Sequence, residues 1–198
     1  MGVQLKWLFL AGLSWQMPFE GFSLAAEPAG AAVVDAEYNR LADRLSRLAK
    51  KGQWTGAERV YRQLSQLGRP LAHPELLTCA EVERRAGNMQ ATYNCLRQAA
   101  KVEGTREVID WLVALEEQTG RVRIVLGDGE SPELVPAAPL FLPEQQAALS
   151  FANQRLREER NFEGRLPVGR YSLGPEEFRV QSAEATEVGP ASDPAGAR

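Results

Sequence analysis

Residues 48–52 read Leu-Ala-Lys-Lys-Gly, residues 84–87 read Arg-Arg-Ala-Gly, and residues 117–120 read Glu-Gln-Thr-Gly. Each segment closes a stretch in which apolar residues recur at helical spacing, and the final glycines lie 35 and 33 residues apart. In the first two copies a bulky residue, Trp54 or Met89, follows two positions later and a second helix begins. A fixed period of this length predicts stacked helical hairpins, which commonly act as docking surfaces.

The chain of 198 residues has the composition of an ordinary soluble globular protein. Hydrophobic residues make up 44% and charged residues 25%, so an apolar core can form. The net charge of -3 argues against a nucleic-acid partner, which requires a clustered basic surface. His73 is the only histidine, whereas metal-dependent and histidine-based catalytic sites need several imidazoles or cysteine clusters. We therefore expect no enzymatic activity, no metal and no small-molecule cofactor.

Residues 1–26 have the pattern of an export signal. A lysine precedes a short apolar run at residues 7–13, and Ser-Leu-Ala at residues 23–25 predicts cleavage after Ala25 or Ala26. The apolar run is shorter than the about 20 residues that a membrane-spanning helix needs. The long stretch before the cleavage site departs from the pattern, and an uncleaved anchor or a misplaced start fits it too. We predict a periplasmic or secreted protein with no membrane span after cleavage.

Five helices are expected within residues 35–120, after a linker of small residues at 27–34. Side chains that accept from free backbone N–H groups mark helix starts, and proline is favoured in a first turn. Thr55 and Glu58 have the spacing of a capping box. The expected starts are at Asp35, Thr55, Pro74, Asn88 and Thr105.

The residues that match a known repeat are Gly52, Trp54, Ala57, Tyr61 and Pro70 in the first copy, and Ala80, Gly87, Met89, Leu96 and Ala99 in the second. With these residues the segment resembles the tetratricopeptide repeat family over about two and a half repeats. It departs from the family at Leu45, where a small residue is usual, and at Leu41 and Leu76, where tryptophan is usual. The resemblance implies a right-handed stack of antiparallel hairpins whose concave face is lined by the first helix of each pair.

That alignment brings seven polar side chains toward the concave face: Asn39, Asp43, Ser46, Lys50, Glu81, Arg84 and Arg85. We interpret them as a candidate groove for an acidic or C-terminal peptide segment of a protein partner. An ordinary solvated helix face explains the same charges. The carboxylate clamp of chaperone-binding repeats is not matched, because Ala42, Pro74 and Thr78 stand where that pattern has Lys or Asn.

Cys79 and Cys95 are the only cysteines and fall on neighbouring expected helices, beside the apolar stripes. In an exported protein such a pair favours a disulfide, which would contribute about 3 kcal/mol for a loop of this size. Two buried, inert thiols are the alternative. A redox-active pair is not expected, because the Cys-x-x-Cys arrangement that lowers a thiol pKa is missing.

Residues 121–181 change to the alternating pattern of β-strands. The turn-rich segment 127–132 reads as a hairpin turn. Residues 143–159 have a composition that fits a helix, whereas residues 149–151 also read as a strand that enters a turn. The clearer strand patterns lie at residues 121–126, 162–166, 170–173 and 178–180.

Residues 166–173 read Leu-Pro-Val-Gly-Arg-Tyr-Ser-Leu. This stretch resembles the "LPxGxYxL" segment of small bacterial β-sandwiches, the PEGA and carboxypeptidase-regulatory-like modules. The resemblance implies that a Pro-x-Gly turn leads into a strand whose tyrosine, Tyr171, enters the core. We therefore predict an α+β fold with N-terminal antiparallel helical hairpins and a small antiparallel β-sandwich-like module. Residues 182–198 lack apolar periodicity, which predicts a disordered tail.

Two and a half repeats are too few to bury a shared core, because helical stacks usually need three or more. The face expected to be left open is formed by Val108, Trp111, Leu112 and Leu115. We predict that the β-rich module packs over this face.

These features together predict a non-catalytic exported adaptor that docks protein partners in the bacterial cell envelope. The alternative is an envelope-polymer or carbohydrate-binding module that uses the β-rich part, with Phe151, Phe162 and Phe178 as candidate contacts. An enzyme of unfamiliar type has no positive feature in its favour.

Overall fold

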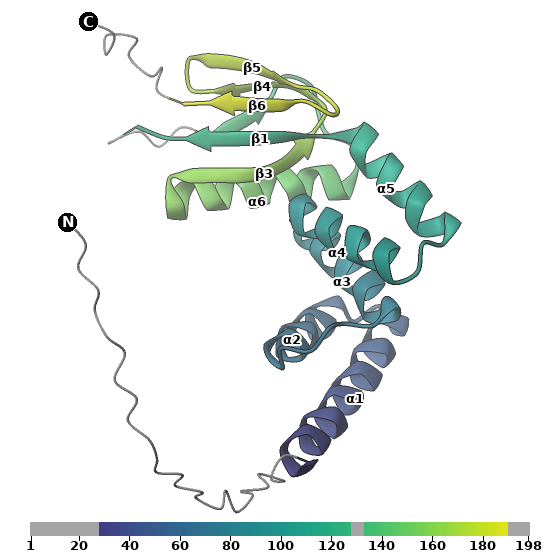
Figure 1. Cartoon of the computed structure of the whole chain (residues 1–198). Helices are drawn as coiled ribbons and strands as arrows, with labels where there is room; N and C mark the ends of the chain where they lie inside the picture. Colours follow the sequence, from purple (N-terminus) through teal and green to yellow (C-terminus); the bar gives the residue numbers. More distant parts are fainter. Residues whose placement is uncertain (1–27, 128–132, 190–198) are drawn as a thin grey trace, which may run out of the picture.

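The chain folds into a helical part followed by a part with two small sheets, in a computed structural model that describes residues 28–127 and 133–189 (Figure 1). The fold class is α+β, as predicted. The helical part contains α1 (Pro28–Lys50), α2 (Trp54–Gln66), α3 (His73–Ala86), α4 (Met89–Val102) and α5 (Arg106–Gln118). The second part contains β1 (Thr119–Val125), β2 (Leu134–Pro136), α6 (Pro143–Glu159), β3 (Asn161–Pro167), β4 (Gly169–Leu173), β5 (Glu176–Val180) and β6 (Ala185–Val188). The expected signal at residues 1–26 lies outside the described residues.

The ends of α3, α4 and α5 follow the capping signals of the sequence. Gly87 ends α3 in the left-handed conformation, with φ of 83°. The Asn88 side chain accepts a hydrogen bond from the backbone N–H of Ala91 at 3.2 Å, and Thr105 accepts one from Val108 at 3.4 Å. These bonds satisfy backbone donors that a helix start leaves free, so the predicted caps are confirmed.

Helix α1 begins earlier than predicted. It starts at Pro28, so the predicted linker at 27–34 is helical from Pro28 onward. Asp35 lies inside the helix rather than at its N-cap, and its carboxylate forms an ion pair with Arg69. The physical reason is local, because proline favours a first helical turn and the alanines that follow have the highest helix propensity.

Helix α2 also begins before the predicted capping box. Trp54 is its first residue, Gln53 is the cap position, and no side-chain hydrogen bond caps the helix. Thr55 is therefore an ordinary residue of the first turn. The Trp54 side chain packs against the apolar cluster formed by α1 and α2. We attribute the early start to this contact, which outweighs the local capping signal.

Gly120 does not end a helix, which corrects the interpretation of the third glycine. Helix α5 ends at Gln118 and passes directly into β1. The hydroxyl of Thr119 donates to the carbonyl oxygen of Leu115 at 2.6 Å and so satisfies a free helix-end acceptor. A Cβ at Gly120 would lie 2.1 Å from the carbonyl oxygen of Gln181. Glycine is needed here for the close approach of another chain segment.

The strands form two three-stranded sheets. In one sheet, β1 lies between β3, to which it is antiparallel, and β6, to which it is parallel. This sheet is therefore mixed, which corrects the prediction of a wholly antiparallel module. In the other, β4 lies between β2 and β5, and both pairs are antiparallel. Because β1 and β2 pair in different sheets, segment 127–132 does not join a hairpin; residues 128–132 lie outside the described residues.

The predicted disordered tail is wrong for the segment that forms β6. Residues 185–188 pair with β1, and Val188 is 4% exposed in the core. A strand of four residues is too short to show periodicity in the sequence, and its stability comes from pairing with a strand far away in the chain. Residues 190–198 lie outside the described part.

Residues 143–159 are helical, which decides the ambiguity of this segment and corrects the strand expected at 149–151. Ala152 and Leu156 of α6 are buried in the cluster that holds the inner faces of both sheets. Tyr171 lies in the same cluster, 2% exposed, and its hydroxyl donates to the carbonyl oxygen of Pro167 at 2.8 Å. The position of this tyrosine agrees with the one that the resemblance implied.

Helix α6 joins the two parts of the molecule and lies beside the ends of α3 and α4 (Figure 1). Ala148 of α6 belongs to the same buried cluster as Leu115 of α5. Of the face that was expected to be covered, Val108 and Leu115 are buried, and Trp111 and Leu112 are half-buried. Farther along, Ile109 and Val113 of α5 each remain 47% exposed.

Candidate functional site

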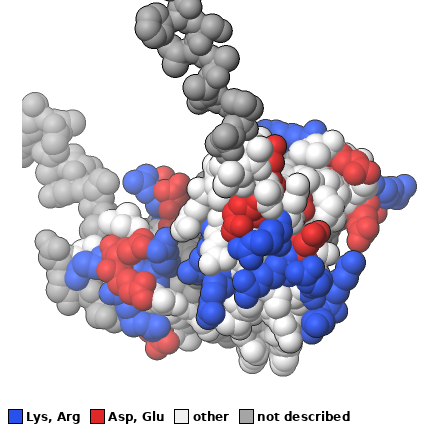
Figure 2. Space-filling view, turned by 90° about the horizontal axis from the view of Figure 1, so that it is seen from below, with Lys and Arg blue, Asp and Glu red and all other residues white. Residues whose placement is uncertain are grey.

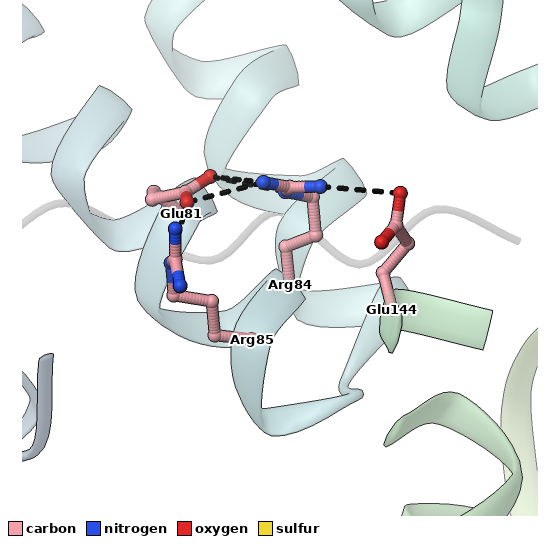
Figure 3. A network of polar contacts seen from close by, with 4 residues as sticks. All are labelled: Glu81, Arg84, Arg85 and Glu144. Carbon is pink, nitrogen blue, oxygen red and sulfur yellow. Dashed lines mark hydrogen bonds and ion pairs between the residues drawn. The ribbon is translucent and has the colours of Figure 1, made fainter. Parts of the chain in front are cut away.

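The residues of the predicted groove divide into two groups. Four lie on one exposed stripe of α1, namely Asn39, Asp43, Ser46 and Lys50. The other three, Glu81, Arg84 and Arg85, lie together on the last turns of α3 (Figure 3). The guanidinium of Arg85 sits 4.4 Å above the ring of Trp54, at the start of α2. Arg85 therefore contacts the start of α2, four residues after α1 ends at Lys50.

Glu81 is the centre of an ion-pair network that reaches the second part of the molecule (Figure 3). The Nε atoms of Arg84 and Arg85 donate to its carboxylate at 3.0 and 2.6 Å. Arg84 also approaches a second carboxylate, because its Nη1 atom lies 3.5 Å from Oε1 of Glu144, in the first turn of α6. Arg84 therefore links the helical part to α6.

The network shifts the titration of its members. Burial raises the pKa of Glu81, but the hydrogen bonds from Arg84 and Arg85 outweigh it, so the pKa lies below the ordinary value of 4.5. The hydrogen bond to Glu81, with a further contribution from Glu144, holds the pKa of Arg84 above its ordinary value. Glu81 and Arg84 are therefore both charged at neutral pH.

A small apolar hollow opens beside Arg84, where α3, α5, α6 and the end of β3 meet. Its volume is about 80 Å³. That is roughly half of a 150 Å³ cavity that holds a benzene ring, so the space suits one small aliphatic side chain. Its lining consists of Met89, Trp111, Ala114, Leu115 and Pro167, with the polar residues Arg84, Gln118, Thr119, Glu144 and Gln145.

Arg165 is a buried charge that the sequence pattern did not reveal. It lies on β3, is 5% exposed, and donates through Nε and Nη2 to the hydroxyl and carbonyl oxygens of Thr119 at 2.8 and 3.1 Å. Its guanidinium stacks 4.8 Å over the ring of Tyr93, whose hydroxyl donates to Glu116 at 2.7 Å. Burial lowers the pKa of Arg165, and the bond to Glu116 raises the pKa of Tyr93. These groups form a polar joint between α4, α5 and the sheet.

A second and larger hollow, of about 340 Å³, lies between α4, the end of α6 and the start of β3. Phe151 and Phe162 both line it, although Phe162 is 4% exposed and the two rings meet edge to face at 6.5 Å. Phe178 lies elsewhere, stacked on Tyr171 at 5.8 Å. The other lining residues are mostly polar: Asn88, Gln90, Ala91, Asn94, Arg155, Glu159, Asn161 and Glu163.

Cys79 and Cys95 form a disulfide between α3 and α4, which decides between the bond and the alternative of two free thiols. Their Cα atoms are 6.1 Å apart, within the usual range for a bridged pair, and both residues are buried. Within residues 28–127 and 133–189 there is no group of three His, Cys, Asp or Glu side chains that a metal ion would need. In the same ranges no helix combines the length and apolarity required to cross a membrane.

The surface around α1 and α2 is rich in basic side chains. Between residues 40 and 62 there are seven basic residues and two acidic ones. Viewed from below, the molecule shows a broad group of Lys and Arg side chains on its surface (Figure 2). Five of the basic residues, Arg44, Arg47, Lys50, Lys51 and Arg59, are exposed and form no ion pair with another described residue.

Comparison of the chain with models of protein families, with curated proteins and with solved structures gives no match.

Proposed function

We propose that the protein is a non-catalytic exported adaptor, which docks an acidic segment of a partner protein in the cell envelope. One observation carries this proposal: Arg85 lies over Trp54, four residues after the basic end of α1, and its neighbour Arg84 lines the apolar hollow. Such a surface favours a segment with several carboxylates and one small apolar side chain. The charges attract the segment and the hollow holds it in register.

The hollow gives this interaction its specificity for one segment. Trp111 is half-buried in its wall, and partly buried tryptophans are frequent energetic centres of protein interfaces. The amides of Gln118 and Gln145 lie in the same lining and can bond to the backbone of a bound segment. Arg84 already has two carboxylate partners, so its guanidinium is held in place before a ligand arrives.

The arrangement of the helices supports the same function. Helix α1 packs against α3, and the hollow lies between α3 and α5, which are the helices that line the concave face in tetratricopeptide repeats. We propose that α1 to α4 form two such hairpins and that α5 begins a third. The two sheets, with their shared core, are proposed to form a sandwich-like module that closes the array.

The disulfide supports the exported location. Disulfides form and persist in oxidising compartments such as the periplasm and are rare in the cytosol. The Cys79–Cys95 bond lies inside the helical part, in the buried cluster against which Trp111 packs.

Site-specific photocrosslinking in the producing cells tests the adaptor function. A crosslinker in place of Gln118 should capture a partner, whereas one in place of Val102, an exposed residue at the end of α4, should not. The variant Ala114→Phe fills the hollow and should abolish the crosslink at unchanged melting temperature. Lys50→Glu with Lys51→Glu should weaken it. Equal crosslinking in the wild type and in the stably folded Ala114→Phe variant would contradict the proposal.

A second candidate function is binding of an envelope polymer or carbohydrate, and the polar hollow beside Phe151 favours it. Amide and carboxylate side chains are suited to sugar hydroxyl groups, and the volume of about 340 Å³ is typical of small-molecule sites. Retention on peptidoglycan or polysaccharide tests this function. Asn94→Leu removes an exposed amide from the lining and should reduce retention. A wild-type chain that is not retained rules this function out.

A further inference from the structure

A loop before α6 exposes an unusual run of apolar residues. Residues 137–142 read Ala-Ala-Pro-Leu-Phe-Leu. Phe141 is 83% exposed, more than any other large hydrophobic residue in the described part of the chain, and its neighbour Leu142 is 45% exposed. Single exposed apolar residues are ordinary, but a contiguous run on one loop marks an interaction site.

Hydrogen bonds and prolines hold the loop in a defined conformation, and this conformation leaves Phe141 exposed. The side chain of Gln146 donates to the carbonyl oxygen of Leu140 at 2.8 Å. Pro139 and Pro143 restrict the backbone on either side. At the start of the loop, the backbone N–H of Ala137 donates to the carbonyl oxygen of Arg170 at 2.9 Å.

Two arginines lie near the start of this loop. Arg170 on β4 is directly opposite Arg179 on β5, and both are exposed. Like charges in directly opposite positions destabilise a sheet unless an anion compensates them. Neither arginine forms an ion pair with a carboxylate of the described residues, although Glu177 lies two positions from Arg179 on the same strand.

We propose that this edge of the molecule binds the surface of an anionic lipid membrane. Phe141 and Leu142 enter the interfacial region, and Arg170 and Arg179 contact lipid phosphate groups. An apolar loop with cations beside it is the combination that holds peripheral proteins on anionic membranes. A membrane fits these features better than a protein partner because the loop itself lines none of the hollows described above. The contact goes beyond the adaptor function, since it places the folded part of the chain against a membrane surface.

A local fluorescence measurement on the full chain tests this contact. Because both native cysteines are in the disulfide, Phe141→Cys offers a single thiol for an environment-sensitive fluorophore. With vesicles of equal parts phosphatidylglycerol and phosphatidylcholine, we expect a blue shift for the label at position 141. The matched control, Val102→Cys on α4, should show none, although Val102 is 58% exposed. No shift at position 141, or an equal shift at both positions, overturns the proposal.

Unlabelled variants separate the apolar contribution from the charged one. Phe141→Ser should lower the vesicle partition coefficient about tenfold, because the free energy of burying a phenylalanine ring is lost. Arg170→Gln and Arg179→Gln should each lower it about fivefold with anionic vesicles and leave partition to pure phosphatidylcholine unchanged. A blue shift that appears on raising protein concentration without vesicles indicates contact between two copies and overturns the lipid assignment. If millimolar inorganic phosphate lowers the partition coefficient of the wild type to that of the arginine variants, the two arginines form a free-phosphate site. That result also overturns the lipid assignment.

Discussion

Replacing Gly87 with alanine should destabilise the protein much more than the same change at Gly52 or Gly68. All three glycines have a left-handed backbone, with φ of 83°, 66° and 68°. An alanine in this conformation costs about 1–2 kcal/mol, so that contribution is common to the three variants. The variants differ in what the new methyl group meets.

At Gly68 no atom lies within 4 Å of the added Cβ, and at Gly52 the nearest is Nε1 of Trp54 at 3.9 Å. At Gly87 the Cβ would lie 2.1 Å from the carbonyl oxygen of Ala147 and 2.8 Å from the backbone nitrogen of Ala148. Backbone atoms of a helix cannot turn aside as a side chain can. Helix α6 would have to retreat by about 1 Å, and overpacking of this kind costs about 1–3 kcal/mol beyond the backbone strain.

Guanidinium chloride unfolding followed by circular dichroism measures these differences. We expect a loss of about 1–2 kcal/mol for Gly52→Ala and for Gly68→Ala. For Gly87→Ala we expect a loss of about 3–5 kcal/mol. If the three variants lose the same free energy of unfolding, then α6 does not lie against the turn between α3 and α4. The two parts of the molecule would then be joined by other contacts.

Three further predictions concern the polar joint, the ion-pair network and the disulfide. Arg165→Met removes two hydrogen bonds to Thr119 while it keeps an apolar stem, and should lower the free energy of unfolding by about 2 kcal/mol; an unchanged denaturation midpoint would contradict the joint. Because the pKa of Glu81 lies below its ordinary value of 4.5, its ion pairs add stability above that pH and lose it as the pH falls through the lowered pKa. Glu81→Gln should therefore lower the free energy of unfolding by about 1 kcal/mol at neutral pH and leave it unchanged in strong acid. An equal difference in melting temperature between the variant and the wild type at both pH values would refute this. Unfolded, unreduced protein should show no free thiol, and reduction of Cys79–Cys95 should cost about 3 kcal/mol; two titratable thiols in the unreduced sample would exclude the bond.

The parts of the fold that follow from local signals could be predicted from the sequence. Asn88 and Thr105 cap their helices with their own side chains, and Gly87 ends α3 through its backbone freedom. Each of these signals acts within a few residues. The same holds for the spacing of Glu81, Arg84 and Arg85, which places the three side chains on one turn of helix before any tertiary contact forms.

Contacts between distant segments could not be predicted. Glu144 completes the network from a different part of the chain, and no feature of its neighbours indicates that partner. Arg165 occupies a position that strand alternation assigns to solvent, yet α4 and α5 cover that side of the sheet. Gly120 has the appearance of a helix end, because a glycine that admits a neighbouring backbone cannot be told from a cap by sequence alone.

The central position of β1 has a consequence for the order of folding during synthesis. Its two partners in the sheet both come later in the chain, β3 more than thirty residues after it and β6 nearer to the C-terminus (Figure 1). Until residues 185–188 have emerged, one edge of β1 has unpaired backbone groups that can recruit another chain. A chain that ends before Ala185 should therefore aggregate even though its helices are complete. The helical part, in contrast, has its disulfide and every residue of its two apolar clusters except Ala148 as soon as α5 has been made.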